Sequence, residues 1–175
     1  MKLSVKYVVP LIFINFSLYA QNTDSLFLSA AIMKLKHAKD YTIRVAELMP
    51  EGKYTFKPTS DEMSFGEQLL HLSANMKWLS SSYLAKAESP VLKIDTPCAK
   101  KECIITNLAK TYDYAITILQ KFDPVHLSDT VGFFAGTINK LQVINLLNDH
   151  QTHHRAQLLV YLRLNKLKPP EYIGW

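Results

Sequence analysis

The sequence predicts an all-α protein, a four-helix bundle, and three observations lead to that prediction. Apolar residues recur at steps of three and four in four separate segments, the spacing of one face of a helix. The prolines beyond residue 24 all fall between these segments or after the last of them, where prolines end helices. No segment shows a strand pattern of comparable strength. A chain of 175 residues, 48% of them hydrophobic, is also long enough for one domain with its own core.

The first two predicted helices span about residues 24–49 and 64–83. Pro50 and Gly52 end the first. Ser64 and Glu67 form a capping box at the start of the second, in which each side chain satisfies a backbone amide of the other residue. The apolar seams are formed by Leu28, Ala31, Leu35, Ala38, Thr42, Val45 and Leu48 in the first helix and by Phe65, Leu69, Leu72, Met76, Leu79 and Tyr83 in the second.

The other two predicted helices span about residues 104–122 and 137–165. Pro124 ends the third helix, Thr137 is the candidate N-cap of the fourth, and Pro169 and Pro170 follow its end. The connection between the second and third helices is long enough to cross the bundle, so an up-and-down order is not required. We expect the core to bury Phe65, Leu69, Leu72, Met76, Leu108, Leu147 and Leu158.

Residues 1–20 have the pattern of a secretory signal peptide. Lys2 and Lys6 precede an apolar run too short to span a bilayer, and Ala20 offers a cleavage point before Gln21. The alternatives are an uncleaved membrane anchor and a buried N-terminal helix. We favour export, so the mature domain would be residues 21–175, in a bacterial periplasm or secreted, without a stable membrane anchor.

The charge of the chain argues against nucleic acid as a partner. Cleavage would remove two lysines and lower the formal net charge from +5 to about +3, and no cluster of Lys and Arg lies beside stacking aromatic residues. Cys98 and Cys103 are the only cysteines. In an oxidising compartment they could pair, but not if both were helical, so the sequence leaves this disulfide open.

His150 and His154 are the most informative residues of the chain, because they lie four apart within an apolar helical stripe. Two imidazoles on a buried face each need hydrogen-bond partners, and a shared divalent metal would satisfy one nitrogen of each. The alternative is a pair of core histidines satisfied by protein groups. His153 falls on a boundary face, which suits a surface residue or one that supports a ligand. No Glu follows His150, so this is not the helix of the zinc proteases.

A third metal ligand should come from another helix that faces the same core. His126 follows Pro124 in a loop, where histidines are mostly solvated. His37 stands among lysines on a face that suits solvent. His71 lies on a polar line with Gln68, Asn75 and Trp78, which suits either a pocket or a boundary with solvent. The sequence pattern alone does not decide between His71 and His37 as the third ligand.

Two blocks of sequence bear a family resemblance. The first joins Tyr54-Thr-Phe-Lys-Pro58 to Ser64-Phe-Gly-Glu-Gln-Leu-Leu-His71, and the second runs from His150-Gln-Thr-His-His154-Arg155-Ala156-Gln157 to Trp175. Together they resemble the DinB/YfiT-like proteins over roughly residues 24–175. The resemblance implies a four-helix bundle with a crossover between its second and third helices. It also implies a divalent metal held by His71, His150 and His154. Ala156 stands where the family often has Gly.

The resemblance implies an activity only in outline. Three neutral imidazoles would leave the charge of the metal uncompensated and a position open, so that bound water or thiol would ionise more readily. Some relatives are thiol-dependent transferases or isomerases, which is one activity that the resemblance implies. Hydrolysis of a small-molecule substrate is the other reaction class. A non-catalytic module that binds a metal or small ligand is the alternative from a different class.

Several features stay open at the level of sequence. No carboxylate has an evident role as a general base. Arg155 could clamp an anionic group, although an arginine on a helix surface is usually just solvated. The identity of the metal (Zn, Ni, Fe or Mn) is open, as is the oligomeric state, a homodimer included.

Overall fold

The computed structural model describes residues 8–94 and 97–175, with side chains from Thr23 onward. Four long helices make up most of it: α1 (Val8–Leu48), α2 (Phe65–Leu79), α3 (Lys101–Gln120) and α4 (Lys140–Leu164). A π-helical turn, η3 (Ser80–Leu84), extends α2, and single 3-10 turns lie at Glu51–Lys53 and Pro124–His126. A two-stranded antiparallel hairpin, β1 (Thr130–Phe133) and β2 (Gly136–Asn139), precedes α4.

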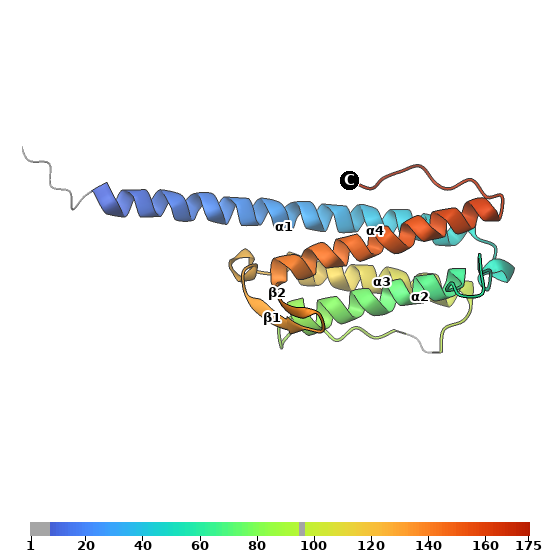
Figure 1. Cartoon of the computed structure of the whole chain (residues 1–175). Helices are drawn as coiled ribbons and strands as arrows, with labels where there is room; N and C mark the ends of the chain where they lie inside the picture. Colours follow the sequence, from blue (N-terminus) through green and yellow to red (C-terminus); the bar gives the residue numbers. More distant parts are fainter. Residues whose placement is uncertain (1–7, 95–96) are drawn as a thin grey trace, which may run out of the picture.

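The four helices form one bundle in which each helix packs against two others. α1 contacts α3 and α4, and α2 contacts the same two helices from the other side. The connection after η3 runs back along the length of the bundle, so α2 and α3 point in the same direction (Figure 1). The predicted four-helix bundle with its crossover is therefore confirmed.

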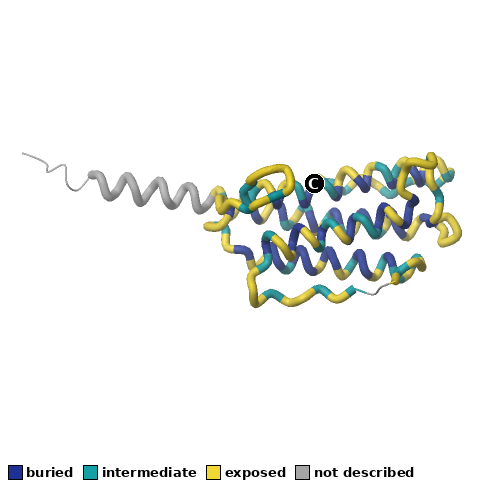
Figure 2. Tube along the Cα trace, turned by 60° about the horizontal axis from the view of Figure 1, so that its bottom comes forward, coloured by how far each residue is buried: buried dark blue, intermediate teal, exposed yellow. Residues whose placement is uncertain are grey.

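The apolar seams read from the sequence form the core. Buried residues face the inside of the bundle on all four helices (Figure 2). Every residue that we expected in the core is fully buried, and the cluster that they form is continuous across the helices. These residues are Phe65, Leu69, Leu72, Met76, Leu108, Leu147 and Leu158.

The start of α2 is the capping box that the sequence predicts. The Ser64 hydroxyl accepts a hydrogen bond from the Glu67 amide at 3.3 Å, and the Ser64 amide donates to the Glu67 carboxylate at 2.6 Å. Because both orphan amides are satisfied, the first residues of α2 are held in a fixed position. That position matters because His71 lies less than two turns further along the helix.

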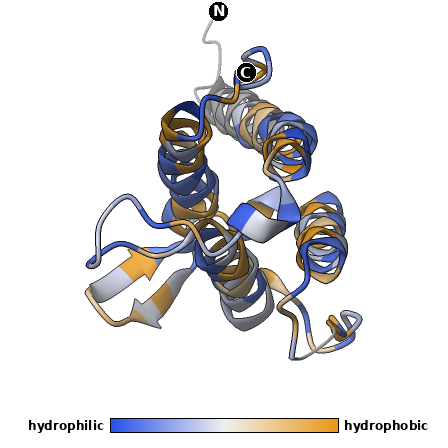
Figure 3. Cartoon of the chain, turned by 90° about the vertical axis from the view of Figure 1, so that its right-hand side faces the viewer, coloured by the Kyte–Doolittle hydropathy of each residue, from blue (hydrophilic) through white to orange (hydrophobic). Residues whose placement is uncertain are grey.

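The predicted start of α4 is wrong. Thr137 lies in β2 and is not the N-cap, whose place is taken by Asn139, with its side chain accepting from the Gln142 amide at 2.8 Å. The hairpin explains the difference: Thr130 pairs with Asn139 and Phe133 with Gly136, which leaves a two-residue turn. Gly136 has a positive φ of 113°, a conformation that glycine adopts without strain. Figure 3 looks along the bundle and shows the hairpin outside the four helices.

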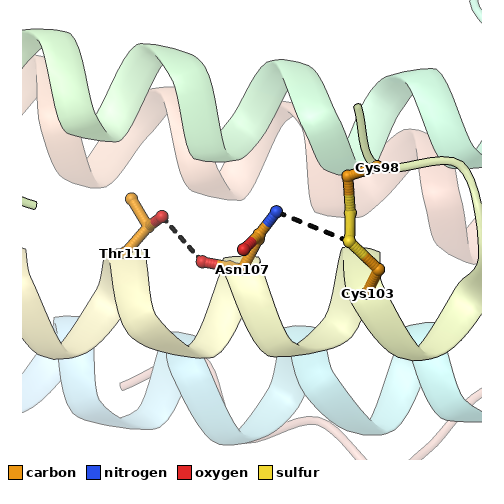
Figure 4. The surroundings of a disulfide bond; sticks show 4 residues. All are labelled: Cys98, Cys103, Asn107 and Thr111. Atoms are coloured by element: carbon orange, nitrogen blue, oxygen red, sulfur yellow. Dashed lines mark hydrogen bonds between the residues drawn. A yellow bond between two sulfur atoms is a disulfide. The ribbon is translucent and has the colours of Figure 1, made fainter. Parts of the chain in front are cut away.

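Cys98 and Cys103 form a disulfide, which settles a question that the sequence left open. Cys98 precedes α3 and Cys103 lies in its first turn, so only one of the two is helical and their Cα atoms are 5.7 Å apart. Figure 4 shows the bond beside Asn107, whose amide nitrogen donates to Cys103 Sγ at 3.8 Å. The disulfide fastens the end of the crossover connection to α3.

The predicted signal peptide falls largely outside the described residues. Residues 1–7 are not described, and for 8–22 only the helical backbone that continues α1 is described. Cleavage before Gln21 therefore stays a prediction. No helix that the structure describes is both long and apolar enough to cross a membrane.

Candidate metal centre

Three histidines from two helices converge between α2 and α4. His71 comes from α2, and His150 and His154 from adjacent turns of α4. Their ring centroids are 4.4–5.0 Å apart in all three pairs. One ring nitrogen from each lies within 4.8 Å of the others, and Nε2 of His71 is 3.1 Å from Nε2 of His150. Among the described residues these three form the only cluster of histidine, cysteine or carboxylate donors close enough to hold a metal ion.

The spacing of the nitrogens fits a common divalent metal ion after a small movement. Zinc binds imidazole nitrogen at about 2.0–2.1 Å in a tetrahedral arrangement, so two nitrogens of one ion lie about 3.4 Å apart. The nitrogens of His71, His150 and His154, within 4.8 Å of one another, need to close by at most about 1.4 Å. His150 and His154 lie four residues apart on one rigid helix, so only His71 depends on the packing between helices.

Two of the three histidines are held in the neutral form that binds metals. Burial, together with the neighbouring histidines, lowers the pKa of His150 and of His154 to about 4. A neutral imidazole binds a metal without first losing a proton. The cluster is therefore prepared for a cation at neutral pH.

Gln68 fixes the orientation of His154. Its Oε1 accepts a hydrogen bond from Nδ1 of His154 at 2.5 Å, so the proton lies on Nδ1 and Nε2 is left as the metal-binding atom. Gln68 is 1% exposed and in turn donates to Gln157 Oε1 at 2.7 Å. Gln157 donates to Nε2 of His153 at 3.2 Å. The exposed His153 thus ends a chain of hydrogen bonds and lies outside the cluster, as its boundary position in the sequence suggested.

The remaining two histidines are engaged elsewhere, which decides between His71 and His37. His37 Nδ1 donates to the backbone oxygen of Trp175 at 2.5 Å, where the C-terminal segment lies against α1. His126 pairs with Asp129 at 2.9 Å in the exposed turn after α3. Sequence reasoning could not exclude His37, because its partner is 138 residues away.

The cluster is open on one side and lacks an acidic neighbour. His154 is 6% exposed, whereas His71 and His150 are only partly buried, so the side that they line faces solvent. His150 Nδ1 and Asn75 Oδ1 are buried atoms without a hydrogen-bond partner in the described part of the chain. Asp149 lies on α4 next to His150, but its side chain is exposed. The site therefore offers three imidazole donors on a face that is partly exposed to solvent.

Arg155 is buried, and the expectation of a solvated arginine is wrong. It is 4% exposed, its Nη1 lies 3.5 Å from the Thr42 hydroxyl, and its guanidinium stands 5.1 Å from the centre of the Tyr41 ring. Thr42 and Tyr41 belong to α1, so the guanidinium is directed toward α1 and away from His71 on α2.

Arg155 belongs to a polar network inside the bundle. The Tyr112 hydroxyl donates to Gln151 Oε1 at 2.8 Å and lies 2.9 Å from the Thr42 hydroxyl. Burial raises the pKa of Tyr112 to about 12, against the opposing effects of Thr42 and Arg155. This network joins α1, α3 and α4 on the side opposite the histidine cluster.

Fold and site together define a class: a four-helix bundle with a crossover whose α2 and α4 present three converging histidines. Residues 34–158 match a family model described as the DinB superfamily, which is well over half of the chain. The chain belongs to the DinB superfamily.

Relatives of known sequence and structure agree with this assignment. The chain is 24% identical over 129 residues to the uncharacterized protein YjoA of Bacillus subtilis, covering 71% of this chain and 82% of YjoA. The crystal structure of YjoA, described as DinB-like, matches with a TM-score of 0.68 at 17% identity, over 82% of this chain and 96% of YjoA. A DinB-like protein of Bacillus cereus matches with a TM-score of 0.65 at 16% identity, over 84% of this chain and 95% of that protein. At these identities the structures establish the fold alone.

Proposed function

We propose that this protein holds one divalent metal ion on His71, His150 and His154 and uses it to transform a small molecule. The observation that carries the proposal is the convergence of three imidazoles, two of them kept neutral by burial and one of these oriented by Gln68. Zn, Ni, Fe and Mn all suit such a donor set, and availability would decide among them.

The chemistry follows from the donors. A dication on three neutral nitrogens would keep its full charge and promote ionisation of a water or thiol at the open side. The chain supplies the rest: α4 fixes His150 and His154, Gln68 sets the tautomer of His154, and the bundle excludes water from the inner side. The DinB resemblance supports transfer of a thiol nucleophile, and hydrolysis is the second reaction class.

The second candidate is a non-catalytic module that binds a metal or a small ligand. It is favoured by one observation: among the described residues no carboxylate joins the histidine cluster, so the chain supplies no acidic general base there. Turnover would then have to rely on the bound ion and the substrate itself.

We place the mature protein, residues 21–175, in the periplasm or outside the cell. The charged and apolar pattern of residues 1–20 supports export. The Cys98–Cys103 disulfide also supports it, because such bonds persist in oxidising compartments and are rare in the cytosol.

The experiment is a paired activity screen of untagged protein loaded with Zn, Ni, Fe or Mn. One arm measures transfer of a small thiol to an electrophilic acceptor, and the other measures hydrolysis of activated esters and amides. An enzyme gives turnover that is lost in His150→Ala and retained in His126→Ala, whose histidine lies in the exposed turn after α3. Metal binding without turnover in either arm would favour the binding module.

A further inference from the structure

Four aromatic side chains gather at one end of the bundle. Trp78 of α2, Tyr83 of η3, and Phe133 and Phe134 of the hairpin form what we call the aromatic cluster. Trp78 stacks on Phe133 and Phe134 at 5.5 and 6.4 Å, with the rings inclined by 28° and 30°. Tyr83 contacts Trp78 at 5.5 Å and Phe133 at 5.8 Å. The rings therefore form one continuous surface contributed by three elements.

Much of this surface is exposed. Phe134 is 85% exposed and Trp78 36% exposed, although burial of such rings is strongly favourable. A contiguous exposed apolar patch commonly marks a binding site, whereas apolar residues scattered singly need no such explanation. The position of this patch indicates what it binds.

The aromatic cluster lies on the same face of α2 as the metal centre. His71, Asn75 and Trp78 are spaced at i, i+4 and i+7, so their side chains form one line along the helix. Trp78 is about 10 Å along the axis from His71. Between them lies Asn75, whose buried Oδ1 lacks a hydrogen-bond partner among the described residues.

The hairpin ties the same surface to α4. β2 contacts α4 and leads directly into it through the Asn139 cap, eleven residues before His150. Seen along the bundle, the hairpin stands on the side of α2 and α4, the two helices that carry the histidines (Figure 3). The metal centre and the aromatic cluster therefore lie along the same side of α2. The surface is polar at the histidines and apolar at the hairpin.

We propose that the aromatic cluster binds the aromatic ring of the substrate whose metal-binding group reaches His71, His150 and His154. This inference rests on the proposed function and specifies its substrate class: a small molecule with an anionic donor at one end and a flat ring about 10 Å away. The β1–β2 hairpin then selects substrates while the histidines act on them.

The test uses two hydroxamates, which bind metals through the same donor group and differ in their tails. Zinc-loaded full chain is titrated calorimetrically with acetohydroxamate and with 7-phenylheptanohydroxamate, whose ring is separated from the donor by six methylenes and so reaches about 10 Å. We expect the phenyl compound to bind at least about tenfold more tightly. Trp78→Ala and Phe134→Ala should remove this preference while leaving the affinity for acetohydroxamate unchanged. Phe134 is so exposed that its loss does not threaten folding.

The control is Tyr172→Ala, which removes another exposed aromatic residue, 68% exposed, that packs near α1 rather than the hairpin. It should keep the full preference. Equal affinity for the two hydroxamates in the wild type would overturn the inference while leaving the metal centre intact. Failure of acetohydroxamate to bind zinc-loaded protein would instead contradict the open metal position of the proposed function. Self-association that Phe134→Ala abolishes, without any change in hydroxamate preference, would identify the patch as a contact between copies and also overturn the inference.

Discussion

Gln68 Oε1 accepts a hydrogen bond from His154 Nδ1 at 2.5 Å, across the contact between α2 and α4. The bond sets the tautomer of the most buried of the three candidate ligands, because an amide oxygen can only accept. Groups that hold the second nitrogen of a metal-binding histidine fix the ring and raise its basicity. Gln68 lies one turn before His71 on α2, so the same helix supplies one ligand and orients another.

Gln68→Ala should weaken metal binding by about 10- to 100-fold, because His154 loses the acceptor that orients it. Gln68→Glu keeps an acceptor for Nδ1 and should retain most of the affinity, although it cannot donate to Gln157. Affinities are measured by competition with a chelator of known strength. Equal affinities of the wild type and Gln68→Ala would show that the hydrogen bond plays no part in ligand positioning.

The metal-free protein should lose stability as the pH falls from neutrality. The pKa of His150 and of His154 is lowered from 6.5 to about 4 in the folded state, so between these values the unfolded chain binds more protons. The stability that these neutral histidines contribute is therefore complete above pH 6.5 and is lost as the pH falls toward 4. The measurement is Tm from pH 7 to pH 5 in the presence of a chelator. His150→Ala should show a shallower decline, and an identical decline would contradict the assignment.

Arg155 should matter for stability and not for metal binding. Arg155→Ala removes the cation over Tyr41 and leaves Thr42 without that donor, at a cost of about 2–3 kcal/mol in the free energy of unfolding. Arg155→Met, which fills the space without a charge, should cost less than about 1 kcal/mol. Urea unfolding measures both. A loss of metal or hydroxamate affinity in Arg155→Met would contradict this prediction, because it would show that the guanidinium contributes to binding at the histidine cluster.

Export can be tested directly on the expressed protein. Mass spectrometry of the periplasmic fraction of a Gram-negative host should find a chain that begins near Gln21, with Cys98 and Cys103 oxidised. The same protein expressed from residue 21 without a leader should stay in the cytosol. Recovery of the chain only in the cytosol and starting at Met1 would contradict the proposed localisation.

The long helices and the ligand pair could be predicted from the sequence because each depends on local spacing. The seam of α2 and its capping box use residues within three or four positions of each other, and so do His150 and His154. A period that is repeated over five turns is a strong signal.

The elements that escaped prediction depend on distant contacts or on short segments. The hairpin has four residues per strand, and its strongest apolar signal, Phe133, packs against Trp78 more than fifty residues earlier in the chain. Asn139 rather than Thr137 caps α4 because β2 occupies the intervening residues. The burial of Arg155 follows from Tyr41 and Thr42 on another helix, and the choice of His71 over His37 from the packing of α2 against α4. None of these contacts leaves a period in the sequence.

The three-histidine centre is tested most directly by the metal content of two neighbouring variants. His154→Ala removes a buried ligand, whereas His153→Ala removes an exposed ring that hydrogen-bonds to Gln157 and packs edge-on against His154 without joining the three-histidine cluster. Untagged proteins are loaded with zinc, dialysed and analysed by mass spectrometry of the metal. We expect about one zinc per chain in the wild type and in His153→Ala, and a small fraction of that in His154→Ala. Equal zinc content in the two variants would contradict a centre built on His71, His150 and His154.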